Sequence, residues 1–247
     1  MKHTTQLLSA RVLTAALFLV AGRSTALNAE PTIDSHDYVP WSRGAGIYVS
    51  VGPGTEIRTS PDRVNWTKRD SRSSSSLYDV DYGNGIFVAV GNEGLVLTSQ
   101  DGTRWTQQNA RTDERLRGIV FAQNLFVAVG YAGTIITSID GRDWALRSSG
   151  TDQRLVSIAY GNGTFVVVGW NGNVVTSRNG MHWFRQNSGT SVHLQRVTWK
   201  YNVFTASGDA GIVLQSVDGI SWTGGFPVGI TDSYPKWNNL EFALQGP

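Results

Sequence analysis

The sequence predicts an all-β protein built from one repeated unit, and three observations lead to this prediction. Five tryptophans recur at a spacing of 39 residues: Trp66, Trp105, Trp144, Trp183 and Trp222. Short runs of β-branched and aromatic residues inside each unit are separated by Gly/Asn turns, a pattern typical of strands joined by hairpins. The repeated region shows no helical stripe of about ten residues or more. A period of about 40 residues with four strands per unit predicts a β-propeller, in which each unit is one blade.

The second unit shows how the strands of a blade follow one another. We expect strands at 77–82, 86–90 and 95–99, and a fourth strand after Trp105. The first two strands are joined by Asn84-Gly85, a pair that suits a turn with positive φ at both central residues. Five complete blades of this kind extend from Tyr38 to Phe226.

Each unit ends its third strand in a seven-residue box, which reads Ser-x-Asp-Gly-x-x-Trp in its commonest form. The Ser and Asp side chains can bond backbone groups of a tight turn, and the Gly permits left-handed backbone. The Trp buries a ring of about 150–250 Å². A catalytic group is needed once, so a carboxylate present in every repeat indicates turn architecture. The box residues are Ser60, Asp62, Trp66, Ser99, Asp101, Trp105, Ser138, Asp140, Trp144, Ser177, Asn179, Trp183, Ser216, Asp218 and Trp222.

This box resembles the Asp-box, or BNR repeat, of sialidase-like β-propellers. The longer unit resembles repeats of exported bacterial propellers and of the photosystem II assembly and stability factor family. The resemblance covers residues 38–226 and implies a propeller fold. It does not choose among functions, because such propellers include hydrolases, receptors and assembly factors. Two positions depart from the pattern: Arg63 replaces the box glycine in the first blade, and Asn179 replaces the aspartate in the fourth.

Both ends of the repeat array carry further repeat-like sequence. Segment 237–246 aligns with 199–208, which predicts two strands of a partial sixth blade. Segment 32–38 resembles the box segment 138–144, so the N-terminal segment 27–37 is expected to supply a closing strand. The alternative is a truncated relative of a longer propeller. The predicted propeller domain covers residues 38–247.

The first 26 residues are predicted to be a signal peptide. Lys2 and Arg11 precede an apolar run at 12–22, and small residues follow at 24–26. The apolar run is too short to cross a hydrocarbon core of about 30 Å, although an uncleaved anchor or a buried helix remains the alternative. No other segment is apolar enough to enter a membrane. The mature chain is therefore expected to lack a transmembrane span and to be secreted or periplasmic.

Composition excludes several classes of function. The chain has 21 basic and 19 acidic residues. The predicted signal peptide contains three basic and no acidic residues, so the remainder carries a net charge of −1 and no electrostatic footprint for nucleic acid. Without Cys there is no disulfide, thiolate metal site or Cys nucleophile. The four His lack zinc spacing, so we expect no metal and no cofactor.

Stacking the repeats separates structural positions from unusual ones. Trp41 falls in a column with Val80, Ile119, Ile158 and Val197, and is expected in the core. The turn between the second and third strands carries Tyr131 and Trp170 where other blades have Pro, Asn or Asp. The connection between blades opens on the same face and carries Arg115, Arg154 and His193. These five residues are the predicted ligand site, where aromatic rings and cations can hold a protein or carbohydrate partner.

We therefore interpret the sequence as an exported, monomeric propeller that serves as a non-catalytic binding scaffold for a protein or glycan partner. No catalytic residue is assigned. One alternative is a glycoside hydrolase, either sialidase-like or using two carboxylates from Asp79, Asp81, Glu93 and Asp209. Another is an assembly factor for a membrane protein complex, which the family resemblance alone implies.

Overall fold

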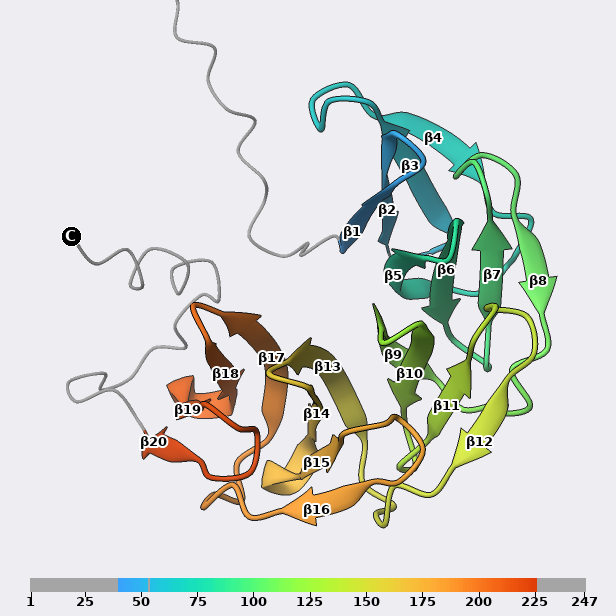
Figure 1. Cartoon of the computed structure of the whole chain (residues 1–247). Coiled ribbons are helices and arrows are strands. Elements are labelled where there is room, and N and C mark those ends of the chain that lie inside the picture. Colours follow the sequence, from blue (N-terminus) through green and yellow to red (C-terminus); the bar gives the residue numbers. More distant parts are fainter. Residues whose placement is uncertain (1–39, 53, 226–247) are drawn as a thin grey trace, which may run out of the picture. The chain divides into compact units, whose positions relative to one another are not determined.

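A computed structural model describes residues 40–52 and 54–225, which form five antiparallel four-stranded sheets in chain order (Figure 1). The described residues all belong to one compact unit. Each sheet is one blade, as the sequence predicted. The predicted signal peptide, the closing segment 27–37 and the partial sixth blade at 237–246 lie outside the described residues.

The strands of every blade follow the order of the chain, from the inner strand to the outer one. Blade 1 contains β1 (Trp41–Gly44), β2 (Ile47–Gly52), β3 (Glu56–Ser60) and β4 (Thr67–Asp70). Blade 2 contains β5 (Leu77–Gly83), β6 (Ile86–Gly91), β7 (Val96–Ser99) and β8 (Thr106–Gln108). Blade 3 contains β9 (Leu116–Ala122), β10 (Leu125–Gly130), β11 (Ile135–Ser138) and β12 (Ala145–Arg147).

The last two blades each include a short 3₁₀ turn between their second and third strands. Blade 4 contains β13 (Leu155–Gly161), β14 (Thr164–Gly169), η1 (Trp170–Gly172), β15 (Val174–Ser177) and β16 (Phe184–Gln186). Blade 5 contains β17 (Leu194–Lys200), β18 (Val203–Gly208), η2 (Asp209–Gly211), β19 (Val213–Ser216) and β20 (Thr223–Gly225). The described part of the chain has no helix with the length and apolar character needed to cross a bilayer.

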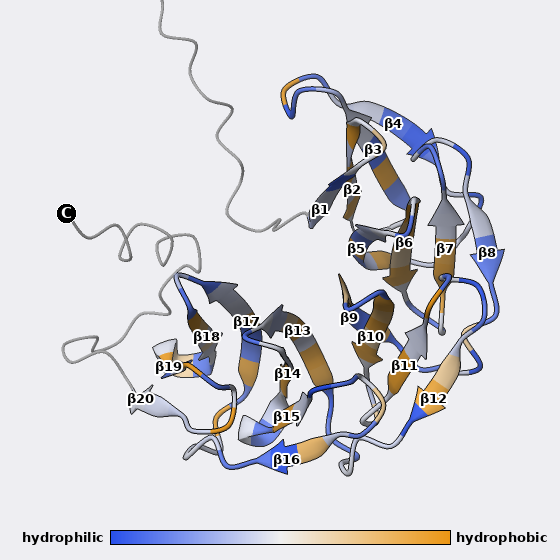
Figure 2. Ribbon diagram, in the orientation of Figure 1, coloured by the Kyte–Doolittle hydropathy of each residue, from blue (hydrophilic) through white to orange (hydrophobic). Residues whose placement is uncertain are grey.

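The core consists of four apolar clusters, each lying between two consecutive blades. The inner strands β1, β5, β9, β13 and β17 contact one another in sequence order. The second strand of each later blade contributes a fully buried phenylalanine: Phe87, Phe126, Phe165 and Phe204. Figure 2 shows the apolar residues concentrated on the middle strands. Blades therefore pack face against face around a common axis, which is the propeller arrangement.

The boxes form the turns between third and outer strands. In blade 3, Asp140 accepts hydrogen bonds from Ser138 and from the backbone N–H groups of Arg142 and Asp143. Each box aspartate accepts hydrogen bonds from the backbone N–H groups three and two residues further along the chain. These bonds stabilise the ionised carboxylate and hold its pKa below the usual value in Asp62, Asp101, Asp140 and Asp218. The Trp144 indole N–H donates to the Gly141 carbonyl at 2.9 Å.

Blade 1 departs from the pattern of the other four. Arg63, at the position of the box glycine, adopts left-handed backbone with φ 66°. Its guanidinium lies 4.5 Å from the ring centroid of Trp41. Trp41 is 44% exposed, so the expectation that it belongs to the core is wrong. The corresponding residues of later blades are buried against the preceding blade, whereas no blade precedes β1 within the described residues.

Candidate functional site

Two sets of loops bring the five predicted site residues to one face of the propeller. Tyr131 follows β10 and Trp170 follows β14, while Arg115, Arg154 and His193 stand immediately before the inner strands β9, β13 and β17. Backbone hydrogen bonds join the loops within each blade. The Tyr131 N–H donates to the Arg115 carbonyl, and the Trp170 N–H donates to the Arg154 carbonyl, both at 2.9 Å.

Arginines and aromatic rings alternate across blades 3 and 4, and the imidazole of His193 in blade 5 ends the series. The Arg115 guanidinium lies 5.0 Å from the Tyr131 ring centroid. The Arg154 guanidinium lies 4.4 Å from Tyr131 and 3.9 Å from Trp170. The His193 imidazole stacks on Trp170 at 4.5 Å with an interplanar angle of 7°. We call these five residues, together with Tyr78 and Arg117, the arginine–aromatic ladder. Such contacts hold each guanidinium in a defined direction.

Tyr78 and Arg117, which are not among the predicted site residues, extend the ladder toward blade 2. The Arg117 guanidinium lies 4.4 Å from the Tyr78 ring centroid, and that of Arg115 lies 5.5 Å from it. Both residues are skipped by the strand pairing of β5–β6 and β9–β10, because each is the extra residue of a β-bulge. A bulge redirects a side chain, so the alternation of a regular strand could not place them.

Asn92 holds the side chains of Arg115 and Tyr78 in place. Its side-chain carbonyl accepts a hydrogen bond from Arg115 Nε at 2.5 Å and another from the Tyr78 hydroxyl at 3.3 Å. Asn92 occupies the same turn position in blade 2 as Tyr131 and Trp170 do in theirs. Asn92 orients the Arg115 side chain. Its position in the stacked repeats, shared with Tyr131 and Trp170, is the sequence feature that could have indicated this role.

The ladder carries positive charge that no carboxylate of the described residues neutralises. Arg115, Arg117 and Arg154 are half-buried, and none of them forms an ion pair with a carboxylate in the part of the chain that the structure describes. The His193 Nδ1 accepts the backbone N–H of Asn171 at 3.0 Å, which fixes the orientation of the imidazole against Trp170. Partly desolvated guanidinium groups without a counter-ion favour an anionic ligand.

The carboxylates that suggested hydrolase chemistry are already engaged by the protein. Asp79 accepts the backbone N–H of Ile119 at 2.9 Å, and Asp81 accepts that of Phe121 at 2.7 Å, so both link blade 2 to blade 3. Glu93 accepts the Ser75 hydroxyl, and Asp209 accepts the Gln195 amide. No group of three His, Asp or Glu side chains gathers in a metal-binding arrangement among residues 40–52 and 54–225.

Burial between the inner strands changes the titration of Asp79 and Asp81. Burial raises the pKa of Asp79 to about 7, and the negative charge of Asp81 adds to the rise. Burial also raises the pKa of Asp81. An aspartate has a pKa of about 3.9 in an unfolded chain, so the raised value means that ionisation opposes folding. The stability conferred by neutral Asp79 is present below about pH 4 and is lost as pH rises through 7.

We expect Asp79→Asn to remove this pH dependence. The free energy of unfolding of the native protein relative to the variant should fall between about pH 5 and pH 7, where Asp79 is still protonated in the folded chain and already ionised in the unfolded one, and should level off above that range. Denaturant titrations across that range measure it. Asp101→Asn is the control, since the pKa of Asp101 is lowered and its contribution is constant in this window. Parallel pH profiles for the native protein and Asp79→Asn would contradict the assignment.

Five four-stranded blades around one axis define the class of this protein as a β-propeller. Solved structures bear this out: the chain is similar to YCF48 bound to a D1 peptide, with TM-score 0.60, 16% identity and coverage of 76% of this chain and 66% of that one. YCF48 from Cyanidioschyzon merolae gives TM-score 0.56, 14% identity and coverage of 74% and 70%. A nidogen/laminin complex gives TM-score 0.60, 11% identity and coverage of 76% and 79%. At these identities the likeness is one of fold.

No protein-family model and no curated protein sequence matches the chain. The chain spans just under two thirds of the peptide-bound YCF48 chain.

Proposed function

We propose that this propeller is a binding scaffold that holds an acidic segment of a partner protein on the arginine–aromatic ladder. The observation that carries the proposal is the set of three half-buried guanidinium groups that have aromatic contacts and no carboxylate partner among the described residues. Carboxylates match the fork of N–H donors on arginine, and pre-orientation of that fork lowers the entropy lost on binding.

The ladder favours a peptide over a sugar ring. Stacking a sugar requires an open aromatic face, and the ring of Trp170 is already in contact with Arg154 and His193. The ring of Tyr131 is in contact with two arginines. The rings therefore support the cations, and the cations are the groups that meet the ligand.

The solved structures support the proposal at the level of the fold. YCF48 is a propeller of similar fold that binds a D1 peptide. A protein partner at the ladder, an exported location and a monomeric state remain parts of this proposal. A more specific form of the proposal is that the protein helps to assemble a membrane protein complex. Identification of the partner protein would test this form.

Binding of a fluorescent peptide in which Glu alternates with Ser tests the proposal. We expect fluorescence anisotropy to show binding that weakens with salt, and a peptide with Gln in place of Glu to bind much less. Arg115→Ala/Arg154→Ala should weaken binding at least about tenfold, because hydrogen bonds to charged groups contribute about 1.5–3 kcal/mol each.

The matched control is Arg72→Ala/Arg185→Ala, which removes the same charge from exposed positions outside the ladder. Equal weakening by the two double variants would show attraction to overall charge, and the ladder would lose its role. Equal binding of the Glu and Gln peptides would also contradict the proposal.

A further inference from the structure

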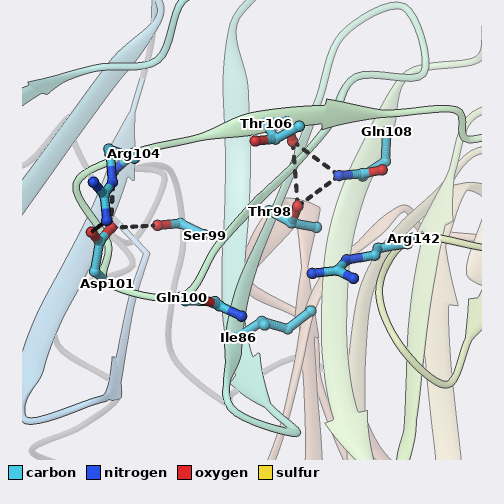
Figure 3. A pocket seen from close by; sticks show the side chains of 9 residues that line it. All are labelled: Ile86, Thr98, Ser99, Gln100, Asp101, Arg104, Thr106, Gln108 and Arg142. Carbon is cyan, nitrogen blue, oxygen red and sulfur yellow. Dashed lines mark hydrogen bonds and ion pairs between the residues drawn. The ribbon is translucent and has the colours of Figure 1, made fainter.

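A groove separate from the ladder lies between blades 2 and 3. Its volume is about 300 Å³, and Figure 3 shows the side chains that line it. Strands β7 and β8 supply Thr98, Thr106 and Gln108, while the box of blade 3 supplies Arg142. Ile86, at the start of β6, is the apolar member of the lining. The groove is large enough for a monosaccharide-sized ligand.

The polar groups of the groove form a small, ordered set. The Gln108 amide donates to the Thr98 hydroxyl at 2.8 Å, which fixes the direction of both side chains. The Thr98 hydroxyl donates in turn to the Thr106 carbonyl at 3.4 Å. Gln100 stands at the rim with an exposed amide. Hydroxyl and amide groups held in this way match a ligand that carries several hydroxyls.

The net charge of the groove is positive. Arg142 forms no ion pair within residues 40–52 and 54–225, and Figure 3 shows its guanidinium directed between Gln108 and Ile86. Arg104 is paired with Asp101 at 3.3 Å. The Asp101 carboxylate also accepts hydrogen bonds from the backbone N–H groups of Thr103 and Arg104, so its hydrogen bonds lie within its own turn. Arg142 is therefore the group available to an anion.

An equivalent groove of about 320 Å³ lies between blades 4 and 5 and provides an internal comparison. It keeps the paired Thr176 and Gln186, with the same 2.8 Å hydrogen bond. Ile220 stands where blade 3 has Arg142, and Phe184 stands where blade 2 has Thr106. Arg178 and Thr164 line this second groove where the first has Gln100 and Ile86. The repeat thus produces the hollow, whereas an arginine contributed by the following blade, at the position of Arg142, belongs to the groove between blades 2 and 3.

We propose that the groove between blades 2 and 3 binds a small anionic ligand rich in hydroxyl groups, of the chemical class of an acidic monosaccharide. The carboxylate pairs with Arg142. The ligand hydroxyls bond Thr98, Gln100 and Gln108, and a less polar side of the ring rests on Ile86. This site is independent of the ladder and does not rest on the proposed function.

Titration with glucuronate, followed by NMR of the backbone amides, tests the proposal. We expect a dissociation constant on the order of 1 mM, given the size of the ligand, with shifts centred on β7, β8 and the box of blade 3. Glucose at the same concentrations should produce much smaller shifts. Arg142→Ile, which places at this position the residue type that Ile220 supplies in the groove between blades 4 and 5, should weaken glucuronate binding at least about tenfold.

Arg115→Ala/Arg154→Ala should bind glucuronate as the native protein does, which separates this site from the ladder. Arg142 is exposed, so its replacement leaves the core intact. Equal shifts with glucose, unchanged binding by Arg142→Ile, or shifts centred elsewhere would each overturn the proposal. An absence of binding at millimolar concentrations would also overturn it.

Discussion

Trp144→Ala is expected to lower the free energy of unfolding by about 3–5 kcal/mol, the usual cost of deleting a large buried aromatic ring. The side chain is 2% exposed and belongs to the cluster between blades 2 and 3. Its loss removes apolar contacts from both blades and leaves the Gly141 carbonyl without the indole N–H. Denaturant unfolding followed by tryptophan fluorescence and circular dichroism would measure the change.

Trp66→Ala provides the matched control. Trp66 has the same place in its box and donates the same type of hydrogen bond, from its indole N–H to the Arg63 carbonyl. It is only half-buried, because no blade precedes blade 1 among the described residues. We expect its loss to cost less than half as much. Equal losses for Trp66→Ala and Trp144→Ala would show that packing between blades is not the source of the stability.

Gly133→Ala is expected to destabilise the protein by about 3 kcal/mol or more, through backbone strain and steric overlap together. Gly133 has φ 66°, and a Cβ placed on it would lie 1.8 Å from the Thr151 carbonyl oxygen. The Gly133 N–H also donates to the Gln153 carbonyl at 2.9 Å, so the turn cannot move without losing this bond. Because the turn also carries Tyr131, we expect Gly133→Ala to weaken acidic-peptide binding as well.

Gly85→Ala separates the two causes. Gly85 has φ 80°, but a Cβ there would meet no atom within 4 Å. Its replacement should therefore show only the cost of left-handed backbone, about 1–2 kcal/mol. Thermal or denaturant unfolding of both variants would measure the difference. If Gly85→Ala were as harmful as Gly133→Ala, close approach of the Thr151 carbonyl would not explain the requirement for glycine.

Periodicity made most of the fold, and part of the site, predictable. A strict repeat places equivalent residues at equivalent points of each blade, so stacking the units was enough to bring Tyr131 and Trp170 to one face with Arg115 and Arg154. The fold class follows for the same reason, since each box has its own turn and each middle strand its own apolar run. These are properties of one blade, which is a local unit of sequence.

Other features could not be read in this way. Tyr78 and Arg117 reach the ladder because bulges interrupt the strand alternation at those residues. Trp41 matches core residues by column, yet it is exposed because burial at that position depends on a preceding blade. The groove at Arg142 also has walls from two blades.

The amino-acid order specifies what each blade is: four strands, a box turn and a row of loop residues on each face. The packing of blades determines which loop side chains of different blades come into contact. It decides which guanidinium lies on which ring and which carboxylate is buried between strands. The physical reason is that hydrogen bonds of a turn are satisfied within a few residues of chain. Burial, charge neutralisation and stacking depend instead on distances between blades, which no single repeat contains.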